Sequence, residues 1–271
     1  PAVWQEHKDG INEWQKVTER LAAIGAGVAY QHPSDVTPWL GTLPSLITIG
    51  TRLADLGGGT YVKQPYHQFD YPEYKPNFKG VCPTRIHNHK RSEMVIEAAL
   101  LMGGGLVLMG SCDNRWERVR WINEFGDWKK YWYQVRKGKL TKTARGKSVG
   151  HGGYSESEAM WILKQGECLV DLTDYSTLPG QDGGRSQYLF LEAWHAKRPL
   201  IIHKNWLIDE DPTMKDGVNC KAISTVEELV GSITDKDWHD CAVECGVEEL
   251  LEHHYSRVVP HLLNVLEAQR A

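Results

Sequence analysis

The sequence has no apolar run long enough to cross a membrane. Its longest apolar stretch, Ala98 to Gly110, is short and contains three consecutive internal glycines, whereas a membrane-spanning helix needs about 20 apolar residues. The start of the sequence also lacks a basic segment followed by an apolar one, which is the pattern of a secretory signal. We therefore expect no membrane span and a cytoplasmic location.

The cysteines lack the C-x-x-C spacing that is common in redox and zinc sites. The six are scattered along the chain: Cys82, Cys112, Cys168, Cys220, Cys241 and Cys245. In a cytosolic protein of this size they are expected to be free thiols. His253 and His254 follow the last two, but the spacing fits no common zinc pattern. We expect helix-face packing there and no metal site.

An excess of positive charge is also missing, since the formal net charge is -4 at neutral pH. A chain of this balance is not expected to bind nucleic acid over its whole surface, although a local basic patch stays open. Over 271 residues, 41% are hydrophobic and 24% are charged. This composition allows a sizeable core in one large or two modest domains.

Short apolar runs alternate with helical patterns from residue 80 onward, which is typical of a parallel sheet built from strand–helix–strand units. The expected strands are 80–82, 106–109, 168–172 and 200–202, and the expected helices are 94–101, 188–195, 225–233 and 247–268. Upstream we expect an amphipathic helix at 2–24, a strand at 46–49 and a short helix at 51–56. The sequence thus predicts an α/β protein with a Rossmann-like parallel sheet, a short N-terminal helical or irregular element and a long C-terminal helix.

Two cations follow the first strand of this sheet. Arg85 and Lys90 lie on the loop between the strand at 80–82 and the next helix. In open α/β sheets ligands bind at this edge, and the helix N-terminus adds partial positive charge. The two side chains would suit a diphosphate. The alternative for this segment alone is a solvated basic loop.

A glycine-rich turn precedes the helix at 188–195. Its residues Gly184, Arg185, Ser186 and Gln187 would let backbone N–H groups approach an anion. Glu192 follows on that helix, where its carboxylate could accept two ribose hydroxyls. The alternative is an ordinary helix with a capping loop.

The order of these motifs resembles the C-terminal, donor-binding domain of GT-B glycosyltransferases, particularly the retaining ones. The similarity covers residues 79–235. It includes the five-residue spacing of Arg85 and Lys90, the strand that ends at Gly110, and Glu192 followed by a lysine, a proline and an apolar tail. The position eight residues before Glu192, where the family commonly has another glutamate, is Gly184.

The resemblance implies that Arg85 and Lys90 hold the donor diphosphate and stabilise its departure without a metal. It implies that Glu192 holds the nucleotide ribose, with the turn at 184–187 close to the phosphates. The implied activity is transfer of a glucose-type sugar from a nucleotide-sugar, with UDP the expected nucleotide, to a hydroxyl acceptor such as a glycan or a modified DNA base. The nucleotide-sugar is a co-substrate, and no cofactor is expected.

On this basis the chain divides into a shortened acceptor-side element at 1–78, a donor-binding domain at 79–243 and a C-terminal helix at 244–271. A second chain or a homo-oligomer could complete the acceptor site. The competing interpretation is a non-catalytic nucleotide-sugar-binding subunit or fragment that needs a separate acceptor domain.

Residues 115–147 combine eleven Lys or Arg with three acids and several aromatic residues. Basic residues with stacking aromatics are typical of nucleic-acid binding, and aromatic platforms also hold sugars. The candidate acceptor surface consists of Trp128, Lys129, Lys130, Trp132, Arg136 and Lys137. The alternative, which we favour, is an amphipathic helix with its aromatics in the core, followed by a solvated basic loop.

Overall fold

The computed structural model describes residues 28–30, 46–48, 60–84, 86, 90–110, 125–136, 139–142, 156–173, 188–207 and 213–268. The chain forms two compact units. The first unit contains residues 1–67, 180–186 and 252–271, and the second contains residues 68–179 and 187–251. The domain boundaries expected from the sequence stay a prediction.

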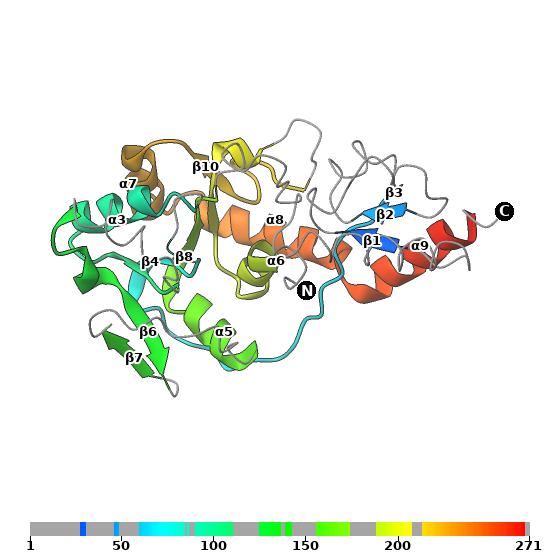
Figure 1. The fold of residues 1–271 in the computed structure, drawn as a ribbon, viewed down its shortest axis with the longest axis horizontal. Helices are drawn as coiled ribbons and strands as arrows, with labels where there is room; N and C mark the ends of the chain where they lie inside the picture. Colours follow the sequence, from blue (N-terminus) through cyan, green and yellow to red (C-terminus); the bar gives the residue numbers. More distant parts are fainter. Residues whose placement is uncertain are drawn as a thin grey trace, which may run out of the picture. The chain divides into compact units, whose positions relative to one another are not determined.

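The second unit is built on a five-stranded parallel sheet with the strand order β10-β9-β8-β4-β5 (Figure 1). Its strands are β4 (Phe78–Cys82), β5 (Leu106–Leu108), β8 (Gly166–Asp171), β9 (Leu200–His203) and β10 (Lys221–Ile223). Strands covered by helices on both faces are nearly continuous apolar runs, as in Leu200–His203. This sheet confirms the expected Rossmann-like α/β fold.

Helices cover both faces of this sheet (Figure 1). The helix α3 (Ser92–Leu101) packs against α7 (Val226–Thr234) on one face, while α5 (Glu156–Leu163) contacts α6 (Tyr188–His195) on the other. The helix α7 begins with a capping box, which Thr225 and Glu228 form. Helices expected at 94–101, 188–195 and 225–233 are thereby confirmed.

The expected single helix at 247–268 is divided in the structure. The helix α8 (His239–Glu252) ends before His253, and α9 (Tyr255–Ala268) begins two residues later. At the break, the backbone forms a hydrogen bond outside the helix: the His253 carbonyl accepts the Tyr66 N–H at 2.7 Å. The His253 ring Nδ1 also donates to the Gln64 carbonyl at 2.9 Å. A contact to a segment far away in the sequence thus ends the helix.

Within the second unit, α8 packs closely on α6. A methyl group at Gly246 would lie 2.2 Å from the buried indole of Trp194. Only glycine allows this close approach of the two helices.

The first unit contains a second parallel sheet. Its strands β1 (Val28–Tyr30), β2 (Leu46–Thr48) and β3 (Thr60–Tyr61) pair in the order β1-β2-β3. The sequence predicted only the middle strand, so the N-terminal part has more regular structure than expected. Along α9, Val258, Leu262 and Val265 form an apolar cluster with Val62. The helices expected at 2–24 and 51–56 lie outside the described residues.

The basic aromatic stretch is not one amphipathic helix. It contains the short 3₁₀ helix η6 (Trp128–Tyr131) and an antiparallel hairpin formed by β6 (Tyr133–Arg136) and β7 (Lys139–Lys142). The side chains of Trp128 and Trp132 are 2% and 4% exposed. Their rings stack with centroids 5.6 Å apart. This part of the stretch therefore contributes two aromatic rings to the core.

Candidate functional site

The neighbouring strands β4 and β8 are followed by connections that leave the sheet in opposite directions. β4 leads through α3 to β5 on one side, whereas β8 leads through α6 to β9 on the other. In open α/β sheets, ligands bind outside the carboxyl ends of the strands at such a switch point. The candidate site therefore lies at the carboxyl ends of β4 and β8.

Lys90 places its ammonium group at this switch point. It precedes α3 by two residues, and its Nζ donates to the Thr173 hydroxyl at 2.6 Å. The same nitrogen lies 4.0 Å from Asp171 Oδ1. The Lys90 side chain is partly buried, with 20% of it exposed.

Asp171 is a buried carboxylate at the end of β8. Its Oδ1 accepts the Thr173 backbone N–H at 3.0 Å and also the Thr173 hydroxyl. Its Oδ2 is buried and has no hydrogen-bond partner among the described residues. Sequence reasoning missed both Asp171 and Thr173. The available signal was an acidic residue within the otherwise apolar run at 168–172.

Cys82 ends β4 beside these groups. Its Sγ lies 3.2 Å from the Thr84 hydroxyl, and burial raises the pKa of the thiol to about 11. The thiol therefore stays protonated at neutral pH, which argues against a nucleophilic role.

Glu192 lies within α6, which follows β8. Burial raises the pKa of its carboxyl group. Among the described residues the carboxylate has no hydrogen-bond or ion-pair partner. A partly buried carboxylate without donors is unfavourable, and ligand hydroxyls could supply them. Its assignment to a ribose stays a prediction. Lys90 precedes α3, whereas Glu192 lies within α6 on the opposite face of the sheet. No contact joins the two residues in the described part of the chain.

Several expected site residues lie outside the described part of the structure. These are Arg85, Gly184, Arg185, Ser186, Gln187 and Lys137. Their assignments stay predictions. Arg136 belongs to β6, but its side chain is not described.

The four remaining members of the candidate acceptor surface divide into two pairs. Lys129 and Lys130 are exposed, and Lys130 Nζ lies 5.0 Å from the centre of the Tyr131 ring. Trp128 and Trp132 are buried, and the Trp132 indole N–H donates to the Gly110 carbonyl at 2.9 Å. For these two tryptophans the burial fits the alternative that we favoured from the sequence, in which the aromatics belong to the core.

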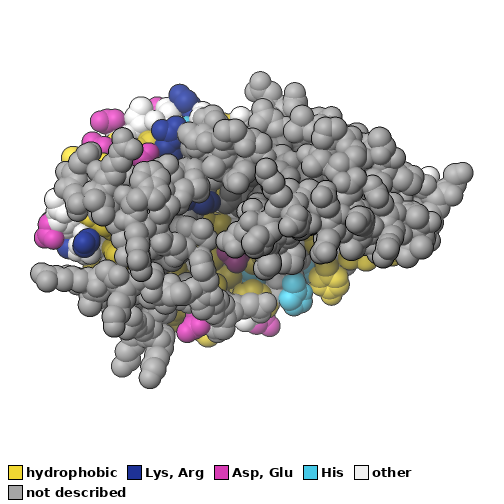
Figure 2. Space-filling model, in the orientation of Figure 1, with side chains coloured by type: hydrophobic (Ala, Val, Ile, Leu, Met, Phe, Trp, Pro, Cys, Tyr) yellow, Lys and Arg dark blue, Asp and Glu magenta, His cyan; other side chains and the backbone are white. Residues whose placement is uncertain are grey.

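The described surface over α3 and α7 carries mixed charge. Figure 2 shows acidic and basic side chains side by side there. Elsewhere in the second unit, Lys236 Nζ pairs with Glu167 Oε2 at 2.7 Å. The surface over α3 and α7 is therefore not a continuous basic face of the kind that binds nucleic acid.

The described ranges contain neither a metal-binding cluster nor a membrane-spanning helix. No group of three or more His, Cys, Asp or Glu residues there is placed to hold a metal ion. His253, one member of the rejected metal group, is buried and engaged with Gln64. No helix in the same ranges is long and apolar enough to span a membrane.

The sheet order, the helices on both faces and the switch point define a doubly wound, Rossmann-like α/β fold. Solved structures of this type are similar to the chain. One is TarM of S. aureus, in complex with UDP and α-GlcNAc-glycerol, at 13% identity and a TM-score of 0.59 over 84% of this chain and 45% of TarM. Another is the pneumococcal O-GlcNAc transferase GtfA with UDP and GlcNAc, at 12% identity and a TM-score of 0.60 over 94% of this chain and 55% of GtfA.

A third similar structure is a glycosyltransferase from Rickettsia africae, at 8% identity and a TM-score of 0.60, covering 97% of this chain and 82% of that protein. The chain thus spans about half the length of TarM and GtfA. No protein-family model and no curated protein matches the sequence. At these identities the likeness establishes the GT-B fold.

Proposed function

We propose that the chain binds a nucleoside-diphosphate sugar at the carboxyl ends of β4 and β8 and transfers its glycosyl group to a hydroxyl acceptor. The observation that carries the proposal is the Lys90 ammonium group at the switch point, partly exposed and hydrogen-bonded to Thr173. A fixed cation at this edge suits a diphosphate. The GT-B fold and the UDP in the TarM and GtfA structures support this choice of ligand.

In the proposed reaction the bond between the anomeric carbon and the diphosphate oxygen breaks as the acceptor oxygen bonds to that carbon. Negative charge develops on the departing diphosphate oxygen, and this oxygen takes up the proton of the acceptor hydroxyl. Lys90, together with Arg85, would stabilise this charge, since a preorganised cation acts most strongly where charge appears. Glu192 would accept ribose hydroxyls. The resemblance to retaining enzymes favours attack from the face that the diphosphate leaves.

UDP-glucose is the donor that we propose to test first. In the similar structures of Anabaena HepE, UDP-glucose is the bound ligand in one case. The acceptor could be a glycan or a modified DNA base, with the exposed Lys129 and Lys130 at its surface.

A non-catalytic nucleotide-sugar-binding subunit is the second candidate. One of the similar structures is a GtfA/B complex of two proteins, and a partner chain or a second copy could likewise complete the acceptor site here.

The first test compares UDP binding by the wild type, Lys90→Met and Lys75→Met. Losing a charge-assisted hydrogen bond is expected to cost about 1.5–3 kcal/mol, or roughly 10- to 150-fold in Kd. Lys75 is exposed and precedes β4, so its variant loses the same charge but should bind UDP normally. Equal affinity of Lys90→Met and the wild type would contradict the site. Donor hydrolysis or transfer would favour the enzyme, and tight binding without turnover the subunit.

A further inference from the structure

The position of the Lys90 ammonium group depends on the strand next to its own. Its nitrogen donates to the Thr173 hydroxyl at 2.6 Å, and Thr173 follows the end of β8. Lys90 itself follows β4, with residues 83–89 between them. A lysine side chain has about 2 kcal/mol of rotamer entropy, so that an unassisted ammonium group would sample many positions around this edge.

The hydroxyl of Thr173 has one hydrogen, which fixes the direction of the network. That hydrogen goes to Asp171 Oδ1, so the oxygen lone pairs of Thr173 face the Lys90 ammonium group. Asp171 Oδ1 also accepts the Thr173 backbone N–H at 3.0 Å. The carboxylate thereby accepts two hydrogen bonds from Thr173, one from the backbone N–H and one from the hydroxyl. Together these bonds fix the orientation of the Thr173 side chain.

The distances also separate Lys90 from direct pairing with the carboxylate. The Lys90 nitrogen is 4.0 Å from Asp171 Oδ1, beyond hydrogen-bond length, while its bond to Thr173 is short. Thr173 therefore lies between the charges and takes one N–H of the ammonium group. The side chain of Asp171 is fully buried, whereas that of Lys90 is 20% exposed. The carboxylate is therefore enclosed in the protein, while the Lys90 side chain is only partly buried.

We propose that Thr173, held by Asp171, is a positioning residue that fixes the Lys90 ammonium group for binding of a nucleoside diphosphate. This inference depends on the proposed function of the site. Preorganising a charged group lowers the entropic cost of binding. Thr173 contributes to diphosphate affinity through Lys90, and it does not contribute to recognition of the nucleoside.

A purely structural role of Thr173 would be to order the loop after β8. In that case its loss would weaken nucleoside and nucleoside-diphosphate binding alike, with or without Lys90. The test therefore needs variants that keep the shape of residue 173 and ligands that differ only in the diphosphate.

The experiment measures calorimetric binding to four variants: Thr173→Val, Thr173→Ser, Lys90→Met and the double variant Thr173→Val with Lys90→Met. UDP, GDP and ADP are first titrated into the wild type, and the diphosphate that binds is used together with its nucleoside. We expect Thr173→Val, which is nearly isosteric, to weaken diphosphate binding about tenfold and to leave nucleoside binding unchanged. Thr173→Ser keeps the hydroxyl and should bind within about twofold of the wild type.

The Lys90→Met background separates positioning from structure. There, Thr173→Val should weaken diphosphate binding no further, since the group through which it acts is gone. An undiminished effect in that background, an equal loss of nucleoside binding, or no loss at all would overturn the role of Thr173. A wild type that binds none of the three diphosphates would instead overturn the proposed function, and with it this inference.

Discussion

The two edges of the central sheet each hold buried or partly buried cations, but they use them differently. At the carboxyl edge, Lys90 is 20% exposed and is hydrogen-bonded to the Thr173 side chain. At the amino edge, the Lys164 side chain is 1% exposed and pairs with Glu73 at 3.2 Å. Arg198, beside Lys164, directs its guanidinium at backbone carbonyls. The Lys90 side chain is thus partly exposed, whereas the Lys164 side chain is enclosed.

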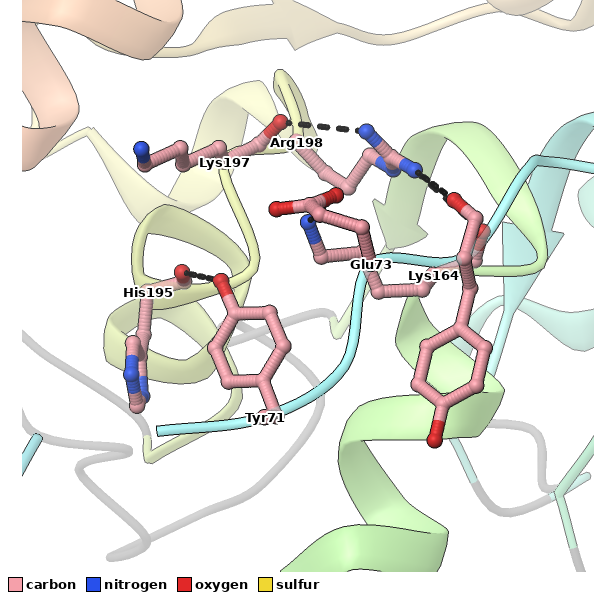
Figure 3. A network of polar contacts seen from close by, with 7 residues as sticks. Tyr71, Glu73, Lys164, His195, Lys197 and Arg198 are labelled. Atoms are coloured by element: carbon pink, nitrogen blue, oxygen red, sulfur yellow. Dashed lines mark hydrogen bonds and ion pairs between the residues drawn. The ribbon is translucent and has the colours of Figure 1, made fainter. Parts of the chain in front are cut away.

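The amino-edge cluster fastens residues 69–77, at the start of the second unit, to α6 and to the segments before β8 and β9 (Figure 3). The Tyr71 hydroxyl donates to the His195 carbonyl, and His195 Nε2 donates to the Phe69 carbonyl at 2.9 Å. Arg198 Nη2 donates to the carbonyls of Tyr74 and Lys164 at 3.4 and 3.3 Å. Cations that satisfy main-chain groups contribute to stability, whereas an oriented and accessible cation is suited to a ligand.

The largest expected difference between the two edges is the loss of stability caused by Arg198→Ala. This substitution removes the donor to three carbonyls, those of Tyr74, Lys164 and Lys197, and should lower the free energy of unfolding by about 2 kcal/mol. In a chain of this size that is a fall of about 4–8 °C in Tm. UDP affinity at a temperature where the variant is folded should not change.

Lys197→Ala is the matched control. Lys197 is the exposed cation next to Arg198, and its loss should change the Tm by less than about 2 °C. Thermal unfolding followed by circular dichroism measures both variants. A loss of UDP binding in folded Arg198→Ala would show that the two edges are not independent.

A smaller effect of mixed sign is expected at Glu192. Burial raises the pKa of this carboxyl group, so the folded state favours the protonated form. The folded state therefore loses stability as the pH rises from the ordinary glutamate range through the raised pKa of Glu192, because the buried carboxyl group then ionises. Glu192→Gln should be more stable than the wild type at pH 7 by a few tenths of a kcal/mol, and the difference should vanish at pH 4. The same variant should bind uridine about threefold more weakly, if the carboxylate accepts ribose hydroxyls.

Urea unfolding at the two pH values and uridine titration test these two statements separately. Glu228→Gln is the control, since its carboxylate caps α7 at the surface and uridine binding should not respond to its loss. A Glu192→Gln variant with unchanged uridine affinity would remove Glu192 from the donor site.

The elements of the second unit were predictable because parallel strands covered on both faces are apolar runs bounded by turn residues. Leu200–His203 and Leu106–Leu108 are such runs, and each was expected within two residues of its observed limits. The order of the strands was not predictable, since it depends on pairing across the sheet. The partnership of Lys90 with Asp171 and Thr173 depends on that order, which is why sequence reasoning missed two of the three residues.

Other features depended on contacts that local sequence does not encode. The break between α8 and α9 results from hydrogen bonds to residues 64–66, which precede it by nearly 190 positions. The tryptophans of residues 115–147 suited either a binding surface or a core, because aromatic side chains serve both, and the core was the interpretation that we favoured. Only packing shows that Trp128 and Trp132 are buried.

The smallest expected effect concerns the enclosed cation at the amino edge. Burial lowers the pKa of Lys164 despite its pairing with Glu73. The folded state therefore favours the neutral amine, and its relative stability rises as the pH increases toward the ordinary lysine pKa. The Lys164 Nζ lies 4.9 Å from the centre of the Tyr71 ring. Replacement by Met keeps nearly the same side-chain length there and removes the titratable amine.

The wild type should thus gain stability relative to Lys164→Met between pH 7 and pH 10. Because Glu73 is exposed and water screens the pair, the gain should be only a few tenths of a kcal/mol. Urea unfolding of both proteins at the two pH values measures it, with Lys75→Met as the exposed control that should show no such change. A change of the opposite sign would mean that the ion pair with Glu73 outweighs burial. Attraction to Glu73 would then hold Lys164 at the amino edge, just as attraction to Lys90 is proposed to hold a diphosphate at the carboxyl edge.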